Sequence, residues 1–356
     1  MTIRLYYKKN KAVVATALFM LIFTIVGCSN NTKNQNSSED TALLDSTLIR
    51  EYANTITAED LKQHLEIYAS DEFEGRGTGT SGQKKAADYL KQFYIKESII
   101  SPIDDTIYFQ DVPASYLPEN TGESENVLAF IKGSEKPEEI IIISAHLDHV
   151  GIINGEIYNG ADDDGSGTVA LLEIAQAFKQ AALKGHGPKR SILLLHVTGE
   201  ELGLYGSRYY SENPIFPLEN TIANLNIDMI GRVDDTHIDN PEYVYLIGSD
   251  RLSDDLHNTS EYINNTFFNL ELDYTFNELD DKNRYYYRSD HYNFAKHNIP
   301  VIFYFNGTHA DYHKATDTVD KINFPMLQKR TQLVFATAWQ LANQSNRPAL
   351  NEDIED

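Results

Sequence analysis

Four short and almost continuous apolar runs are the feature of this sequence that most restricts its fold. They lie at residues 140–143, at 191–197, in the stretch ending at 225–227, and at 299–305. A strand that is apolar at nearly every position is buried on both faces of its sheet, which is typical of parallel α/β sheets. Residues 168–182 lie between the first two runs and carry apolar side chains at helical spacing, which predicts a crossover helix. The sequence therefore predicts an α/β fold.

His, Asp or Glu residues follow each of these runs closely. In open α/β sheets, ligand sites lie beyond the carboxyl ends of the strands, so these side chains are expected to meet there. Imidazole and carboxylate groups are the ligands that a divalent metal such as zinc takes in proteins. The sequence therefore predicts a two-metal site built from five segments: His146-Leu147-Asp148, Gly160 to Gly167, Gly199-Glu200-Glu201, Asn226 to Met229, and Tyr312-His313.

Each segment also has an ordinary explanation when it is considered alone. The run Asp162 to Gly167 could cap the following helix, because Asp and Ser are good N-cap residues. Glu200 and Glu201 could form the solvated start of a helix, and Asp228 could be a turn residue. The metal interpretation depends on the joint pattern, because a solvated acidic residue has no reason to follow one buried strand after another.

Taken together and in this order, the segments resemble the M28 family of zinc aminopeptidases, which are metallopeptidases with two zinc ions. The resemblance covers roughly Glu59 to Asn343 and includes Phe73 to Gly79, Ser289-Asp290-His291 and Asp311 to Thr318. It implies a three-layer α/β/α fold of the zinc-exopeptidase type, with a mixed, mostly parallel central sheet. It also implies an enzyme that hydrolyses N-terminal residues from peptides.

The resemblance further implies two Zn²⁺ ions per chain and names their ligands. His146 and Asp228 would bind one ion, Glu201 and His313 would bind the other, and Asp162 would bridge both. The departures from the family pattern are small: His149 follows Asp148 where many members have serine, and Lys314 follows the ligand histidine.

The same resemblance implies the catalytic roles. Glu200 would be the general base that activates a water shared by the metals. Asp148 would accept the second ring N–H of His146 and fix its tautomer, as metal-bound histidines usually require. Tyr312 would help to stabilise the tetrahedral intermediate. A cis peptide bond is expected between Asp162 and Asp163.

Three other functions compete with the aminopeptidase. A carboxypeptidase-type member would need a cation for the terminal carboxylate, and Arg232 and Arg288 are the candidates. A glutaminyl-cyclase-like enzyme would use a single zinc; the complete two-metal set counts against it, and Trp339, the one tryptophan of the chain, lies well past the site segments. A non-catalytic binding lipoprotein is disfavoured because the base and every ligand are present.

The first 28 residues have the features of a lipoprotein signal peptide. Four basic residues precede the mostly apolar stretch 12–26, which is too short for a usual transmembrane helix. Ile25 to Cys28 then resembles a bacterial lipobox, in which the cysteine is lipidated. Residues 29–45 are expected to form a flexible polar linker and residues 46–356 the peptidase domain. The protein is therefore expected in the bacterial cell envelope, attached to a membrane through lipidated Cys28 and facing the periplasm or exposed at the surface.

The formal net charge of −23 excludes one class of partner. Proteins that bind nucleic acid present basic patches to the phosphate backbone, so a nucleic-acid function is not expected here. The expected partners are peptide substrates with a free N-terminus.

Overall fold

The structure is a computed structural model that describes residues 46–104 and 106–352. The chain divides into two units, Met1–Ser38 and Glu39–Asp356, and every described residue belongs to the second. The predicted signal peptide, its lipobox and the linker lie outside the described residues. Within the described part of the chain, no helix combines the length and apolar character needed to cross a membrane.

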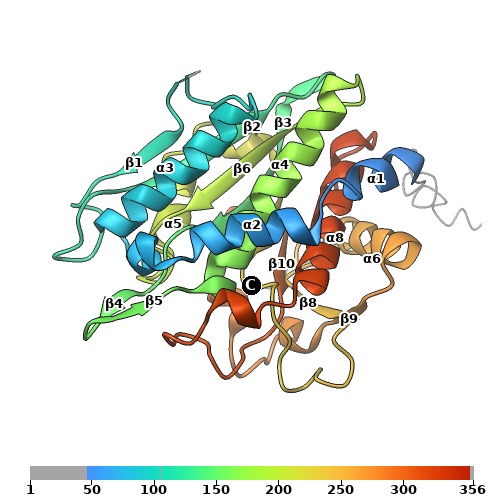
Figure 1. Ribbon diagram of the computed structural model, residues 1–356. Helices are drawn as coiled ribbons and strands as arrows, with labels where there is room; N and C mark the ends of the chain where they lie inside the picture. Colours follow the sequence, from blue (N-terminus) through green and yellow to red (C-terminus); the bar gives the residue numbers. More distant parts are fainter. Residues whose placement is uncertain (1–45, 105, 353–356) are drawn as a thin grey trace, which may run out of the picture. The chain divides into compact units, whose positions relative to one another are not determined.

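One mixed sheet of eight strands forms the centre of the described unit (Figure 1). The four middle strands, β6, β3, β7 and β10, are mutually parallel, whereas β2 and β8 run antiparallel to their inner neighbours. This agrees with the predicted mixed sheet. In spatial order the strands are β1 (Phe109–Val112), β2 (Ser124–Ile131), β6 (Arg190–Val197), β3 (Lys136–His146), β7 (Thr221–Ile227), β10 (Val301–Phe305), β8 (Tyr243–Ile247) and β9 (Glu271–Asp273).

Helices cover both faces of this sheet and make it the middle of three layers. Two short helices, α5 (Tyr205–Glu212) and α7 (His291–Ala295), contribute to the core on one face. Figure 1 shows α2, α3 and α4 across the other face. The helices whose apolar residues contribute to that second core are α1 (Ser46–Ala53), α2 (Ala58–Tyr68), α3 (Ser81–Lys96), α4 (Gly167–Leu183), α6 (Asp254–Phe267) and α8 (Phe324–Asn343).

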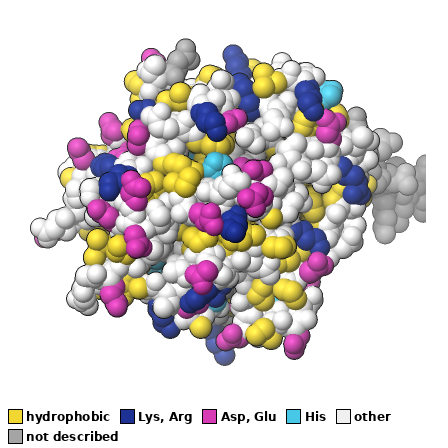
Figure 2. Space-filling model, in the orientation of Figure 1, with side chains coloured by type: hydrophobic (Ala, Val, Ile, Leu, Met, Phe, Trp, Pro, Cys, Tyr) yellow, Lys and Arg dark blue, Asp and Glu magenta, His cyan; other side chains and the backbone are white. Residues whose placement is uncertain are grey.

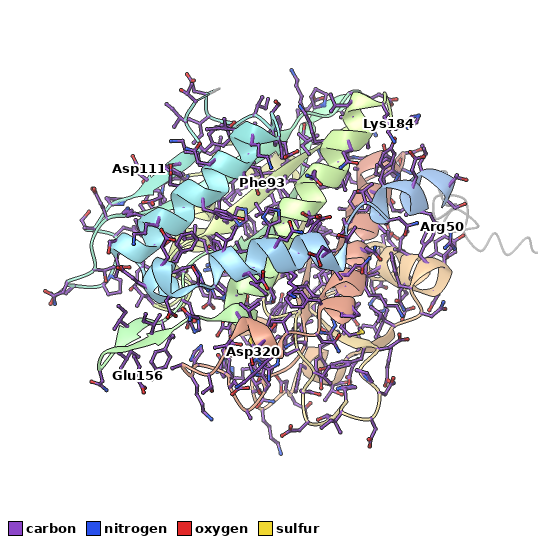
Figure 3. All side chains as sticks on the ribbon, viewed as in Figure 1. Arg50, Phe93, Asp111, Glu156, Lys184 and Asp320 are labelled. Atoms are coloured by element: carbon purple, nitrogen blue, oxygen red, sulfur yellow. The ribbon has the colours of Figure 1, made fainter. Side chains whose placement is uncertain are left out.

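The run of four isoleucines in β3 supplies both cores. Successive side chains of a strand point to opposite faces, so Ile141 and Ile143 join the core under α4 while Ile140 and Ile142 join the core under α5 and α7. All four are fully buried, and each such burial stabilises the fold by roughly 1.5–3 kcal/mol. Phe93 of α3 is buried in the same core as Ile141 (Figure 3). This double burial is why the strand is continuously apolar.

The crossover from β3 to β6 contains α4, as predicted. Because the four middle strands are parallel, their carboxyl ends share one edge of the sheet, and the loops that follow them meet there. The small hairpin of β4 (Gly151–Ile153) and β5 (Glu156–Tyr158) and the segment around Asp320 belong to such loops (Figure 3). On the face shown in Figure 2, acidic side chains are interspersed with Lys and Arg.

Candidate metal centre and active site

Two groups of side chains within residues 46–104 and 106–352 have the composition and spacing of metal sites. The first contains His146 at the end of β3, Asp228 directly after β7, and Asp163 in the loop before α4. His146 Nε2 lies 3.2 Å from Asp163 Oδ1 and 3.6 Å from Asp228 Oδ1. All three residues are buried, so these donors converge on one point away from bulk solvent.

The second group contains His149, Glu201 and again Asp163, which faces it with its other oxygen, Oδ2. Asp163 Oδ2 lies 3.1 Å from His313 Nε2, which in turn lies 3.1 Å from Glu201 Oε2. His149 Nδ1 lies 2.7 Å from Glu201 Oε1. Asp163 therefore faces the first group with one carboxylate oxygen and the second group with the other.

Several buried atoms of these groups have no hydrogen-bond partner. Buried polar groups are ordinarily paired, and an unpaired one costs roughly 1–3 kcal/mol. A divalent cation in each group would give a partner to each of these atoms except the second ring nitrogen of His149, so the residues present fit a pair of metal ions. The unpaired atoms are His146 Nε2, both ring nitrogens of His149, Asp163 Oδ2 and Glu201 Oε1.

The structure brings together four of the five predicted ligands and corrects the fifth. Asp162, the predicted bridge, points elsewhere: its carboxylate accepts hydrogen bonds from Gly231 N at 2.6 Å and Asn306 Nδ2 at 3.0 Å, and lies 3.1 Å from His309 Nε2. The position between the two groups belongs to Asp163. The cis peptide bond is displaced by one residue in the same way, because it joins Asp163 to Asp164.

The third aspartate of this run joins three elements. Asp164 accepts hydrogen bonds from His146 N at 3.2 Å, Met229 N at 3.0 Å and Gly167 N at 2.9 Å. It therefore ties the end of β3 and the segment after β7 to the start of α4. Asp317 supports the run from the opposite side, because one of its oxygens accepts the main-chain N–H groups of both Asp162 and Asp163.

Asp148 differs from its predicted role. The His146 ring nitrogen Nδ1 lies 2.9 Å from the main-chain oxygen of Asp148, whereas the carboxylate is 4.0 Å from that nitrogen. A carbonyl oxygen only accepts, so Nδ1 carries the proton and Nε2 is left free to bind a metal. The Asp148 carboxylate instead accepts from Glu200 N at 3.2 Å and from Thr78 Oγ1 at 2.7 Å. Asp148 thus positions both His146 and Glu200.

Glu200 and Glu201 lie on a turn after β6 and not at the predicted helix start, because α5 begins only at Tyr205. Gly199 has a φ of 66°, and the N–H groups of Gly203 and Leu204 both donate to the Glu200 carbonyl. Neither metal-compatible group includes Glu200, although its Oε2 lies 4.0 Å from His146 Nε2. The turn therefore places the Glu201 carboxylate in a donor group and leaves the Glu200 carboxylate beside the groups.

The environments shift the pKa values of these adjacent glutamates in opposite directions. Burial raises the pKa of Glu200 well above its usual range, and Asp228 and Glu201 add to the rise against the opposing effect of His146. Burial and Asp163 also act to raise the pKa of Glu201, but its contacts with His149 and His313 outweigh them and lower it. Opposite shifts in a pair of carboxyl groups are typical of a division between a proton carrier and a permanently charged group.

A series of hydrogen bonds between buried side chains orients the Asp228 carboxylate. Ser289 Oγ donates to Asp228 Oδ2 at 2.7 Å and accepts from Asn226 Nδ2 at 2.9 Å. Ser144 Oγ donates to Asn226 Oδ1 at 2.7 Å. The Ser-Asp-His motif noted in the sequence therefore contributes its serine to the orientation of Asp228.

A small cavity of about 30 Å³ opens onto both groups. The Tyr312 ring stacks on the His313 ring at a centroid distance of 3.9 Å, and burial together with Asp163 raises the pKa of its hydroxyl. A larger hollow of about 500 Å³ around Asp250 and Arg251 contains none of the metal-compatible residues. The side chains lining the small cavity are Asp163, Glu200, Asp228, Met229, Tyr285, Arg288, Phe303, Phe305, Tyr312 and His313.

The two arginines considered for binding a terminal carboxylate have different surroundings in the structure. Arg232 donates to Asp311 Oδ2 at 2.9 Å and lies 3.7 Å from Asp317 Oδ1, so it is paired inside the loop that carries His313. Arg288 lines the cavity, with its guanidinium 4.9 Å from the centre of the Tyr285 ring. Of these two arginines, Arg288 alone lines the cavity.

Comparison with known proteins assigns the family. Residues 126–338 match Peptidase family M28, and the chain belongs to that family, as its motifs had indicated. A probable zinc metalloprotease of Pyrenophora tritici-repentis is 34% identical over 165 residues, which are 43% of this chain and 32% of that protein. A probable aminopeptidase of Saccharomyces cerevisiae is 28% identical over 227 residues, which are 62% of this chain and 58% of that one. The chain therefore spans about a third to somewhat over half of these relatives' lengths.

Solved structures share the fold. The crystal structure of LapA from Legionella pneumophila superposes with a TM-score of 0.66 at 20% identity, covering 86% of this chain and 79% of LapA. This agrees with the zinc-exopeptidase-like three-layer fold predicted from the sequence.

Proposed function

We propose that this protein is a zinc-dependent aminopeptidase that holds two Zn²⁺ ions per chain and removes N-terminal residues from peptides. The arrangement of Asp163 carries the proposal, because its two oxygens face two separate groups of buried donors while Glu200 lies beside them. When bound, a pair of zinc ions supplies a nucleophilic water near neutral pH and polarises the scissile carbonyl.

Glu200 serves as the general base in this proposal. Its carboxylate lines the cavity and belongs to neither donor group, so it is free to take a proton from the attacking water and deliver it to the departing amine. Asp148 holds the Glu200 main chain and thereby fixes the base relative to His146. The protonated Tyr312 hydroxyl, whose ring lines the same cavity, donates a hydrogen bond to the oxyanion.

The cavity suits a substrate with a free amino group. The carboxylates of Asp163, Glu200 and Asp228 all line it, and a buried ammonium needs such partners. Met229, Phe303 and Phe305 make one side of the cavity apolar, which would favour an uncharged first side chain at its mouth.

Acetylating the amino group of a substrate tests whether the protein recognises the N-terminal end of a peptide. An anilide with a free, apolar N-terminal residue is expected to be hydrolysed by the purified protein. Blocking its amino group is expected to lower kcat/KM by at least about 10²-fold, from the loss of a charge-assisted contact worth roughly 2–3 kcal/mol. Steady-state kinetics on the matched pair of substrates measures this, and equal rates would remove the aminopeptidase assignment while leaving the peptidase one.

A carboxypeptidase is the second candidate function, and Arg288 at the cavity favours it. An arginine can bind a terminal carboxylate through two hydrogen bonds. Release of C-terminal residues first from an unblocked peptide, lost in Arg288→Ala, would replace the aminopeptidase proposal. One bound metal per chain would favour the glutaminyl-cyclase-like alternative, and metal binding without turnover of any peptide would favour a binding lipoprotein.

We also propose that the full-length protein is anchored to a membrane of the bacterial cell envelope through lipidated Cys28. The support is the order of the sequence: basic residues, the apolar stretch 12–26, and the lipobox-like Ile25 to Cys28. Cys28→Ser is expected to abolish incorporation of a fatty-acid probe and to release the protein from the membrane fraction, whereas Ser29→Ala should leave both unchanged. Undiminished labelling of the Cys28→Ser protein would contradict the anchor.

A further inference from the structure

His149 is a buried imidazole of the second group, although it is not among the five ligands expected from the sequence and has no role in the proposed mechanism. It follows β3 by three residues, and its main-chain N–H donates to Arg76 O at 3.3 Å beside a bridge between His149 and Gly77. Its side chain has no exposed surface. The main chain around it is thus fixed by the segment Phe73 to Gly79, and the ring cannot turn out into solvent.

The ring of His149 has a close neighbour but no hydrogen bond. Its Nδ1 lies 2.7 Å from Glu201 Oε1 and 3.8 Å from Asp163 Oδ2. Neither His149 Nδ1 nor Glu201 Oε1 has a hydrogen-bond partner, although the two atoms lie within hydrogen-bonding distance of each other. His149, Asp163 and Glu201 each place one donor atom within 4.8 Å of the others, which is the spacing of a metal site.

A glycine at position 160 leaves room for the His149 ring. A Cβ atom on Gly160 would lie 2.5 Å from His149 Cγ and Cδ2, so only glycine leaves room for the imidazole. Gly160 has a φ of 51°, and its carbonyl accepts a hydrogen bond from Arg76 Nη2 at 2.8 Å. One residue, Arg76, thus holds both the segment that carries His149 and the turn against which its ring packs.

We propose that His149 is a further metal ligand, which completes a four-donor site with Asp163, Glu201 and His313. The inference rests on the proposed two-zinc function and assigns a ligand beyond the five expected from the family resemblance. The site of His146, Asp163 and Asp228 then has three protein donors. A zinc ion held by four protein donors would be bound more firmly than one held by three, and a site with three donors would leave a position for water.

This asymmetry predicts an order of metal binding. The four-donor site should fill first when metal is added to the metal-free protein, and it should keep its ion longest against a chelator. The three-donor site should exchange more readily. His149→Ala should therefore weaken binding of the tighter equivalent by more than about 10²-fold, since residues that only orient a ligand change metal affinity by about 10–100-fold.

The decisive measurement is the ¹H NMR spectrum of the full-length protein loaded with Co²⁺, in which the ring protons of each coordinated imidazole are strongly shifted. Three sets of shifted imidazole signals are expected in the unmodified protein, for His146, His149 and His313. His149→Ala should lose one set, whereas His297→Ala, which removes an exposed histidine outside the site, should retain all three.

The possible results distinguish a failure of the His149 assignment from a failure of the proposed two-metal centre. Two shifted sets in the unmodified protein, with full Co²⁺ loading, would overturn His149 as a ligand and leave the two-metal centre standing. No shifted set, with no bound Co²⁺, would overturn the metal centre itself. The spectrum of the unmodified protein decides between them even if His149→Ala fails to fold.

Discussion

Asp163→Asn is expected to abolish tight binding of at least one metal equivalent and to lower kcat/KM by at least about 10³-fold. Among the residues that the structure describes, Asp163 alone belongs to both donor groups, with its oxygens 3.2 Å from His146 Nε2 and 3.1 Å from His313 Nε2. Replacing it by an amide would remove a negative charge from between the two proposed cations, and an unbalanced buried charge costs several kcal/mol. Metal analysis after gel filtration and steady-state kinetics would measure the two effects.

Asp162→Asn is the matched control, because it makes the same change one residue away. This variant is expected to keep both metals and to lose only stability. An amide nitrogen in place of one oxygen would face a donor, Gly231 N or Asn306 Nδ2, and leave it unpaired, which costs about 1–3 kcal/mol of unfolding free energy. Urea unfolding measures that cost. Loss of metal in Asp162→Asn with metal retained in Asp163→Asn would restore Asp162 as the bridge.

Glu200→Gln is expected to keep both metals and to lower kcat by about 10²–10⁴-fold, the usual contribution of a general base. The amide preserves the shape of the side chain and the main-chain contact with Asp148, but it cannot accept and return a proton. Because Glu200 belongs to neither donor group, metal content should not change. The comparison variant is Glu201→Gln, which should lose metal as well as activity because Glu201 contacts His313 and His149. A nearly fully active Glu200→Gln protein would show that the proton is carried by another group.

The sequence alone was sufficient for the fold class and for the region of the site. Burial on both faces leaves a strand such as 140–143 no polar position, so the pattern that indicates a parallel α/β sheet follows directly from the physics of packing. The carboxyl ends of parallel strands share one edge, so the segments after 140–143, 191–197 and 225–227 had to meet. His146, Glu201 and Asp228 were therefore predicted as neighbours without knowledge of any distance.

Only the tertiary structure showed the turn that carries Glu200 and Glu201 and the hydrogen bonds of Asp148. Glu200 and Glu201 were expected at a helix start, but the turn opened by Gly199 delays the helix to Tyr205. The second ring nitrogen of His146 was expected to meet the Asp148 carboxylate and instead meets its carbonyl. In both cases the residue was predicted and the contact was not, because the contact depends on local backbone direction.

Only the tertiary structure showed which aspartate lies between the two donor groups. Asp162, Asp163 and Asp164 are chemically identical, and nothing in the spacing says which of them points between the donor groups. Each carboxylate is directed by its own φ and ψ, which place Asp162 against Gly231, Asp163 between the donor groups, and Asp164 under the end of β3. His149 gave no signal of its own beyond its place after Asp148, because its significance lies in contacts with a glutamate 52 positions further along the chain. The sequence determined that His, Asp and Glu side chains meet at this edge of the sheet. The backbone directions of a few loop residues decided which of their atoms face the two donor groups.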